Sequence, residues 1–83
     1  MIKLLYFASL RETLGVAGEE LALPAAVATV AALRGHLATR GEPWTVLTRS
    51  QSLRCAVNQA LVGADAGIGD GDEIAFFPPV TGG

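Results

Sequence analysis

The sequence contains few of the residues from which active sites are usually built. Its 83 residues include a single cysteine, Cys55, a single histidine, His36, and only six lysines and arginines. One cysteine cannot form an internal disulfide bond, and no Cys/His cluster has the spacing of metal ligands. The cationic residues are scattered rather than gathered in a basic stripe, which argues against a nucleic-acid-binding protein. The composition therefore predicts no disulfide framework, no metal site and no nucleic-acid partner.

The sequence also lacks a long apolar segment. No apolar run approaches the roughly 20 residues that a membrane-spanning helix needs. The apolar run over residues 1–8 is short, is followed by Arg11 and Glu12, and has no convincing signal-peptide cleavage site. We therefore expect a cytoplasmic protein with no membrane partner.

Apolar residues, by contrast, are abundant and make up 51% of the chain. A chain this short folds as one domain with a marginal core, because it buries only about 60% of the surface that it exposes when unfolded. We expect part of the remaining apolar surface to form a patch that binds a partner.

The pattern of apolar residues predicts an α+β fold. An apolar helical period after the N-cap residue Thr29 predicts one main helix over residues 29–40, followed by Gly41. A second short helix is predicted to begin with Pro43, and residues 9–18 are predicted to form a loop with one helical turn. Alternating and branched apolar residues predict strands at 2–8, 19–23, 53–57, 60–62 and 73–77.

This order of elements predicts a two-layer β-grasp (ubiquitin-like) roll, in which the main helix packs on one face of a mixed sheet. In such a roll the last strand lies in the middle of the sheet beside the first, and a buried parallel pair suits the apolar character of both segments. We expect residues 1–77 to form the domain and residues 78–83 to form an extended, flexible C-terminal tail.

None of the reactive side chains belongs to a complete catalytic set. His36 falls on the polar side of the predicted helix, where a solvated histidine is more common than a catalytic one. Cys55 alternates with Arg54 along a strand, which predicts a buried structural thiol. Asp70 and Asp72 lie in a glycine-rich turn signal, which predicts a turn rather than a metal site.

The remaining candidate is the tail. Two prolines end the last strand and hold the chain extended, because proline fixes φ and has no N–H to donate. Gly82 and Gly83 have no side chains, so the end of the chain can enter a narrow channel in another protein. The reactive group of such a tail is the carboxylate of Gly83, which is inert until it is activated, for instance as a mixed anhydride with AMP. We expect Gly83, together with Gly82, to be the site of chemistry.

An exposed apolar patch is predicted at the root of this tail. Alternation along the first strand places Phe7 on the outward face with Lys3, and alternation along the last strand places Phe77 outward with Glu73. If the two strands are neighbours, both phenylalanines lie beside the tail. The patch is then either a protein–protein interface or a surface covered by a loop.

The sequence as a whole resembles a known family. The segment from Asp70 to Gly83, with its Phe-Phe-Pro-Pro-Val-Thr-Gly-Gly ending, closely resembles the small subunit of molybdopterin synthase. The resemblance covers essentially the whole chain and departs from the family in the loops near residues 15–20 and 63–68. The family's opening strand, main helix and central hairpin are matched by residues 1–8 with Arg11-Glu12, by residues 29–34, and by Ala56-Val57-Asn58-Gln59 with Leu61-Val62.

The resemblance implies a sulfur carrier. In this family an adenylating enzyme, related to ubiquitin-activating enzymes, uses ATP and magnesium to convert the carboxylate that matches Gly83 into an acyl adenylate. A sulfur donor then converts the adenylate into a thiocarboxylate. The tail inserts into the large subunit of the synthase, where the sulfur attacks cyclic pyranopterin monophosphate during molybdenum cofactor biosynthesis. The resemblance thus implies a carrier that binds no cofactor of its own and is not catalytic alone.

The resemblance also implies how the partners are contacted. The complex in this family is a heterotetramer, with two small subunits on a central dimer of large ones. Phe7, Leu61 and Phe77 match apolar positions that the family uses at this interface. The residues that we expect to contact partners are Phe7, Arg11, Leu61, Phe77, Pro78, Pro79, Val80 and Thr81.

Three alternatives remain open. A sulfur carrier for another pathway, such as thiamine thiazole synthesis, shares the fold and the Gly-Gly end, although the Phe-Phe-Pro-Pro-Val-Thr ending argues against it. A protein modifier that forms isopeptide bonds with lysines would use the same activated Gly83, and nothing in the sequence excludes it. A binding module with an unused tail is the third alternative.

Overall fold

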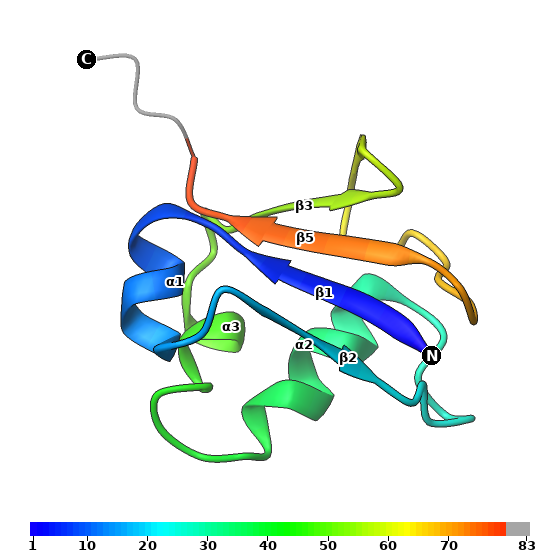
Figure 1. Cartoon of the computed structure of the whole chain (residues 1–83), viewed down its shortest axis with the longest axis horizontal. Helices are drawn as coiled ribbons and strands as arrows, with labels where there is room; N and C mark the ends of the chain where they lie inside the picture. Colours follow the sequence, from blue (N-terminus) through cyan, green and yellow to red (C-terminus); the bar gives the residue numbers. More distant parts are fainter. Residues whose placement is uncertain (80–83) are drawn as a thin grey trace.

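The structure, a computed structural model, describes residues 1–79 of the chain. Five strands form one sheet in the order β2-β1-β5-β3-β4. Helices α2 and α3 lie against one face of the sheet, and α1 lies at the end where β5 finishes (Figure 1). In chain order the elements are β1 (Ile2–Tyr6), α1 (Ala8–Leu14), β2 (Gly18–Leu21), α2 (Val30–Ala38), α3 (Val46–Arg49), β3 (Arg54–Val57), β4 (Ala60–Val62) and β5 (Glu73–Phe77).

Strand β5 lies in the middle of the sheet, between β1 and β3. It runs parallel to β1, with Leu4 opposite Ile74, and antiparallel to β3, with Cys55 opposite Phe76. Strands β2 and β4 pair antiparallel with β1 and β3 at the two edges. The predicted α+β, β-grasp architecture is therefore confirmed, including the last strand beside the first.

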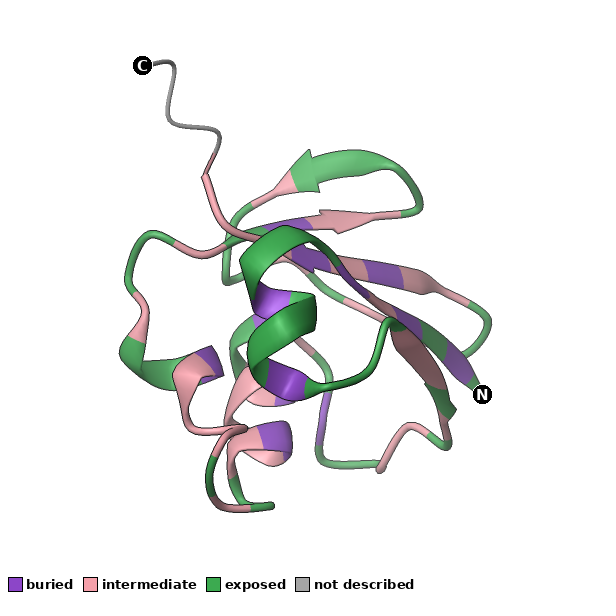
Figure 2. Cartoon of the chain, turned by 60° about the vertical axis from the view of Figure 1, so that its left-hand side comes forward, coloured by how far each residue is buried: buried purple, intermediate pink, exposed green. Residues whose placement is uncertain are grey.

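The core lies between the sheet and the helices (Figure 2, purple). Alternate residues of β1 and β5 point inward, and α2 contributes residues spaced by three and four positions. Full burial of each leucine or isoleucine stabilises the fold by roughly 1.5–3 kcal/mol. The inward packing leaves the opposite face of the sheet directed outward. The largest fully buried side chains are Tyr6, Phe76, Ile2, Leu4, Leu33, Leu37, Leu47, Ile74 and Val30.

The main helix begins as predicted and ends earlier. The Thr29 Oγ1 accepts a hydrogen bond from the Ala32 N–H at 3.1 Å, which confirms Thr29 as the N-cap. The helix ends at Ala38 rather than at residue 40. Gly41 adopts a φ of +85° in the turn that follows, a conformation that glycine tolerates without strain.

The prediction of a loop with one helical turn over residues 9–18 underestimates the helix, because α1 covers the seven residues Ala8–Leu14. Leu10 and Leu14 lie four residues apart on one face of α1 and are buried. Gly15 ends the helix with a φ of +81°. Two apolar residues thus suffice for a short helix where the end of the sheet offers a core to pack against.

Other predicted boundaries shift by a few residues. Strand β1 ends at Tyr6 rather than at residue 8, and β2 covers Gly18–Leu21 rather than residues 19–23. Helix α3 begins at Val46. Pro43 lies in the preceding turns and is not the first helical residue, so this part of the prediction is wrong. The strand predicted over residues 73–77 has the bounds observed for β5.

Candidate functional site

Strand β5 carries the chain to the root of the tail. The strand ends at Phe77, and Pro78 and Pro79 follow it outside the sheet, each half-buried. The tail therefore leaves the fold from the middle strand of the sheet and not from an edge (Figure 1). The remaining predicted site residues, Val80, Thr81, Gly82 and Gly83, lie outside the described residues.

Phe7 and Phe77 flank this root and together form the Phe7/Phe77 patch. The Phe7 N–H donates a hydrogen bond to the Phe76 carbonyl at 3.2 Å, which aligns the residue after β1 with the end of β5. The Phe7 side chain is 44% exposed, and Phe77 is half-buried. The predicted position of both residues, beside each other at the end of the sheet, is confirmed, and Phe7 is not covered by a loop.

Leu61 lies on the same outward face of the sheet, and Arg11 lies on α1 at the end of the sheet. Leu61 pairs with Ala56, which in turn pairs with Ala75 of β5, so all three face outward. Leu61 is 67% exposed, a large value for a leucine. Arg11 is exposed on α1, one turn after Phe7, whose carbonyl accepts a hydrogen bond from the Arg11 N–H at 3.3 Å. The partner-binding role of these residues stays a prediction.

One exposed side chain beside the patch is absent from the predicted contact residues. Arg54, the first residue of β3, lies directly opposite Phe77. Residues directly opposite in an antiparallel pair have Cβ atoms about 4.5–5.5 Å apart. The signal for its position was available in the sequence, because alternation with the buried Cys55 directs Arg54 outward.

Cys55 is a buried structural thiol, as predicted. It faces the core, and burial raises the pKa of its thiol to about 11. Because the thiolate is the nucleophilic form of cysteine, this thiol is inert at neutral pH.

The Asp70–Asp72 segment is a turn, as predicted. Asp72 accepts a hydrogen bond from the Asn58 side chain at 2.9 Å and another from the Gly69 N–H at 2.8 Å. Both bonds stabilise the carboxylate, the one from Asn58 more strongly, and lower the pKa of Asp72. Asp70 pairs instead with the amino group of Met1. These carboxylates hold the turn and the start of the chain together.

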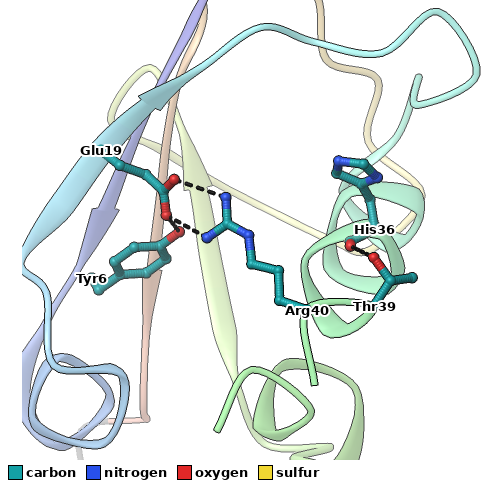
Figure 3. A network of polar contacts seen from close by, with 5 residues as sticks. All are labelled: Tyr6, Glu19, His36, Thr39 and Arg40. Carbon is teal, nitrogen blue, oxygen red and sulfur yellow. Dashed lines mark hydrogen bonds and ion pairs between the residues drawn. The ribbon is translucent and has the colours of Figure 1, made fainter. Parts of the chain in front are cut away.

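A polar network joins the end of α2 to the sheet (Figure 3). Arg40 donates two hydrogen bonds to Glu19, each of 2.8 Å, and the Tyr6 hydroxyl donates to Glu19 at 3.0 Å. The Arg40 guanidinium also lies 4.4 Å from the centre of the Trp44 ring. The hydrogen bonding between Arg40 and Glu19 lowers the pKa of Glu19 and raises the pKa of Arg40. Burial raises the pKa of Tyr6. The polar groups satisfy one another, so the network is structural.

The described residues include no cluster of metal ligands and no membrane-spanning helix. His36 is half-buried on α2 and lies apart from Glu19 (Figure 3). The candidate functional feature of residues 1–79 is instead the exposed surface at the point where the tail begins.

Comparison with known proteins gives matches over the whole chain. The model of the ThiS family matches residues 4–83. The chain is 49% identical to a molybdopterin synthase sulfur carrier subunit of Escherichia coli (strain K12), and 43% identical to a protein of the same name from Haemophilus influenzae. Both matches span 83 residues and cover 100% of this chain and 100% of the relative.

Solved structures share the fold. A Pyrococcus furiosus protein, described as a candidate molybdopterin converting factor, subunit 1, is 31% identical with a TM-score of 0.75, over 95% of this chain and 97% of its own. One chain of a complex of subunits 1 and 2 of molybdopterin-converting factor from Helicobacter pylori matches with 22% identity and a TM-score of 0.65. The match covers 99% of this chain and 97% of the Helicobacter pylori chain. At this lower identity the likeness concerns the fold.

Proposed function

The chain belongs to the ThiS family and is a sulfur carrier of the molybdopterin synthase kind, and we propose that the carboxylate of Gly83 is the group that carries its sulfur. The observation that supports this proposal is the 49% identity to a named sulfur carrier subunit over the full length of both chains. The Gly-Gly end lies inside that match.

The chemistry requires activation, because a carboxylate is a poor acceptor for nucleophiles. A Gly83 carboxylate oxygen attacks the α-phosphorus of ATP, pyrophosphate leaves, and an acyl adenylate forms on an adenylating enzyme that binds the ATP and magnesium. A sulfur donor then replaces AMP and leaves a thiocarboxylate on Gly83. The carrier chain contributes the acyl group and a slender end, and it holds no cofactor for this step.

Delivery requires docking on the large subunit of the synthase, where the thiocarboxylate sulfur attacks cyclic pyranopterin monophosphate. The exposed Phe7/Phe77 patch and Leu61 supply apolar surface for this contact, since buried aromatic side chains dominate the energetics of protein interfaces. The patch lies at the point where the tail leaves the sheet, so docking there directs the tail into the partner. We propose the heterotetramer of the family for this complex, and the Helicobacter pylori complex of subunits 1 and 2, which shares the fold, supports a large-subunit partner.

The proposal is tested by deletion of Gly83 in a reconstituted synthase. The full-length chain, charged with sulfur and mixed with the large subunit and the pterin precursor, should yield molybdopterin. The chain without Gly83 should bind the large subunit with an affinity within a few fold of the full-length chain and yield none. Molybdopterin formation by the shortened chain would show that Gly83 does not carry the sulfur.

A further inference from the structure

The outward face of the sheet is organised in rows that cross the strands. At the end nearest the tail, one row contains Phe7, Phe77 and Arg54, because Arg54 pairs with Phe77 in register and Phe7 follows β1 at the same level. The next row is apolar and has small residues in its middle: Gly18, Leu5, Ala75, Ala56 and Leu61.

The third row carries charge. Lys3 lies opposite Glu20 on one side and opposite Glu73 on the other, so this row has two carboxylates and one amine. It is separated from the first row by four residues of β5, or about 13 Å at the usual rise of a strand. The outward face is thus cationic at the end near the tail, through Arg54, and acidic at its far end.

Arg54 differs from most of the other arginines of the chain because it has no partner among residues 1–79. Arg40 pairs with Glu19, Arg49 pairs with Glu42, and Arg34 donates to two backbone carbonyls. Arg54 is exposed and takes part in none of the ion pairs of this part of the chain. No other side chain of residues 1–79 competes for its guanidinium.

The position of Arg54 favours an ion pair made in direct contact with a partner protein over electrostatic attraction of that partner from a distance. Charges exposed to solvent are screened beyond about 8 Å at physiological ionic strength, whereas a pair enclosed by an interface is screened much less. A partner that covers Phe77 also covers the neighbouring Arg54, whose burial without a carboxylate would cost free energy. A carboxylate of the partner at this point would offset that cost and pair with the charge.

We propose that Arg54 forms an ion pair with a carboxylate of the synthase large subunit and so fixes the direction in which that subunit docks on the sheet. The inference rests on the proposed function, because it assigns a contact within the same complex. An acidic group opposite Arg54 matches the cationic end of the face and avoids the acidic row at Glu20 and Glu73. The reversed orientation would place that acidic group against like charges, which is destabilising. Arg54 thereby holds the partner so that its channel lies over the tail.

Two substitutions at Arg54 and one matched control test the ion pair by titration calorimetry against the large subunit. Arg54→Met keeps an unbranched apolar stem and removes the charge, while Arg54→Glu reverses it. Arg49→Glu makes the same charge reversal on α3, where the exposed pair with Glu42 contributes little stability. We expect affinity to fall at least about fivefold for Arg54→Met and about twentyfold or more for Arg54→Glu. Arg49→Glu should bind like the unmodified chain.

The outcomes separate this inference from the proposed function. If Arg54→Met binds as tightly as the unmodified chain, no attractive pair exists and the inference is wrong, even if Arg54→Glu is repelled. If Phe77→Asp abolishes binding while both Arg54 variants bind normally, the docking face is retained and the ion pair is rejected. If Phe77→Asp also leaves the affinity unchanged, the docking face itself has been assigned wrongly.

Discussion

Cys55 is the only thiol of the chain, yet its position in the core makes it unsuitable as a sulfur carrier. Burial raises the pKa of its thiol to about 11, so almost none of it is ionised at neutral pH. A carrier must present its sulfur to two other proteins in turn, which a side chain packed beneath the sheet cannot do. The cargo is therefore expected at the end of the chain.

We predict that a disulfide-exchange reagent near pH 8 modifies folded Cys55 on the order of a hundredfold more slowly than the unfolded chain. A thiol with a pKa of about 11 is rarely ionised there, whereas that of an unfolded cysteine is about 8.5. Cys55→Ala should still accept sulfur at the end of the chain. Rapid modification of the folded protein, or loss of charging in Cys55→Ala, would contradict the structural role.

Glu19 should make stability depend on pH. The hydrogen bond from Arg40 lowers the pKa of Glu19 in the folded state, so the carboxylate contributes stability above its unfolded pKa of about 4.3. That contribution is lost as the pH falls through the lower, folded pKa. Glu19→Gln should lower the free energy of unfolding by about 1 kcal/mol at neutral pH, and the difference should shrink in acid.

Urea unfolding at neutral pH and near pH 3 measures this difference. Glu12→Gln is the matched control, because Glu12 is exposed on α1 and takes part in none of the ion pairs formed among residues 1–79. An equal loss of stability in Glu19→Gln at both pH values would mean that the ionised pair does not contribute.

At the scale of elements, the β3–β4 hairpin contains a strained turn. Asn58 and Gln59 have φ values of 51° and 71°, and both lie in the left-handed region that side chains disfavour. Asparagine followed by glycine is the preferred pair for a two-residue turn of this kind. We predict that Gln59→Gly raises the free energy of unfolding by about 0.5–1 kcal/mol, because the relief of strain exceeds the added entropy of the unfolded chain.

Thermal or urea denaturation measures this gain. Gln51→Gly is a suitable control, since Gln51 is also an exposed turn residue but is not among the residues with positive φ. The control should be destabilised by a few tenths to about 1 kcal/mol, because glycine adds entropy to the unfolded chain without relieving strain. A loss of stability in Gln59→Gly as large as in the control would show that the turn is not strained.

The fold can be predicted from the sequence where hydrophobic periodicity or a capping residue gives a local signal. The Thr29 cap and the alternating strands each carry a local signal, and both are confirmed. Helix α1 carries almost none, because only Leu10 and Leu14 mark its buried face and the segment is bounded by glycine. Its existence depends on packing at the end of the sheet, which no local pattern contains.

The surface was predictable only where alternation determines a face. Phe7 and Phe77 follow from the two-residue period of their strands, and their proximity follows from the pairing of β1 with β5. The network of Tyr6, Glu19 and Arg40 joins residues 13 and 21 positions apart, and nothing in the sequence marks them as partners. An exposed side chain such as Arg54 likewise has no sequence signature of the contact proposed for it.

At the scale of the whole molecule, the central position of β5 determines where the tail begins. Strand β3 pairs with β5 as far as Phe77, and β1 pairs with it as far as Phe76, so the tail starts from a fixed point in the sheet. The side chains around that point face outward and are available to a partner. The same partner surface can therefore bind the sheet and receive the tail.

We predict that Phe77→Asp weakens binding to the large subunit by about 2 kcal/mol or more, as expected for an interface hot spot. The substitution places a charge in the middle of the Phe7/Phe77 patch. Titration calorimetry with Ala31→Asp as control measures the effect, because Ala31 is exposed on α2, on the side of the molecule away from the outward face, near a helix N-terminus that tolerates an acidic residue. Equal affinities for the two variants would place the interface elsewhere.

The most direct measurement is the intact mass of the chain after incubation with ATP, magnesium, an adenylating enzyme and a sulfur donor. The full-length chain should gain the mass difference between one sulfur and one oxygen atom, and fragmentation should locate that gain at Gly83. The same gain should appear in Cys55→Ala and be absent from the chain that lacks Gly83. A gain found on Cys55, or one that persists without Gly83, would show that the sulfur is carried elsewhere in the molecule.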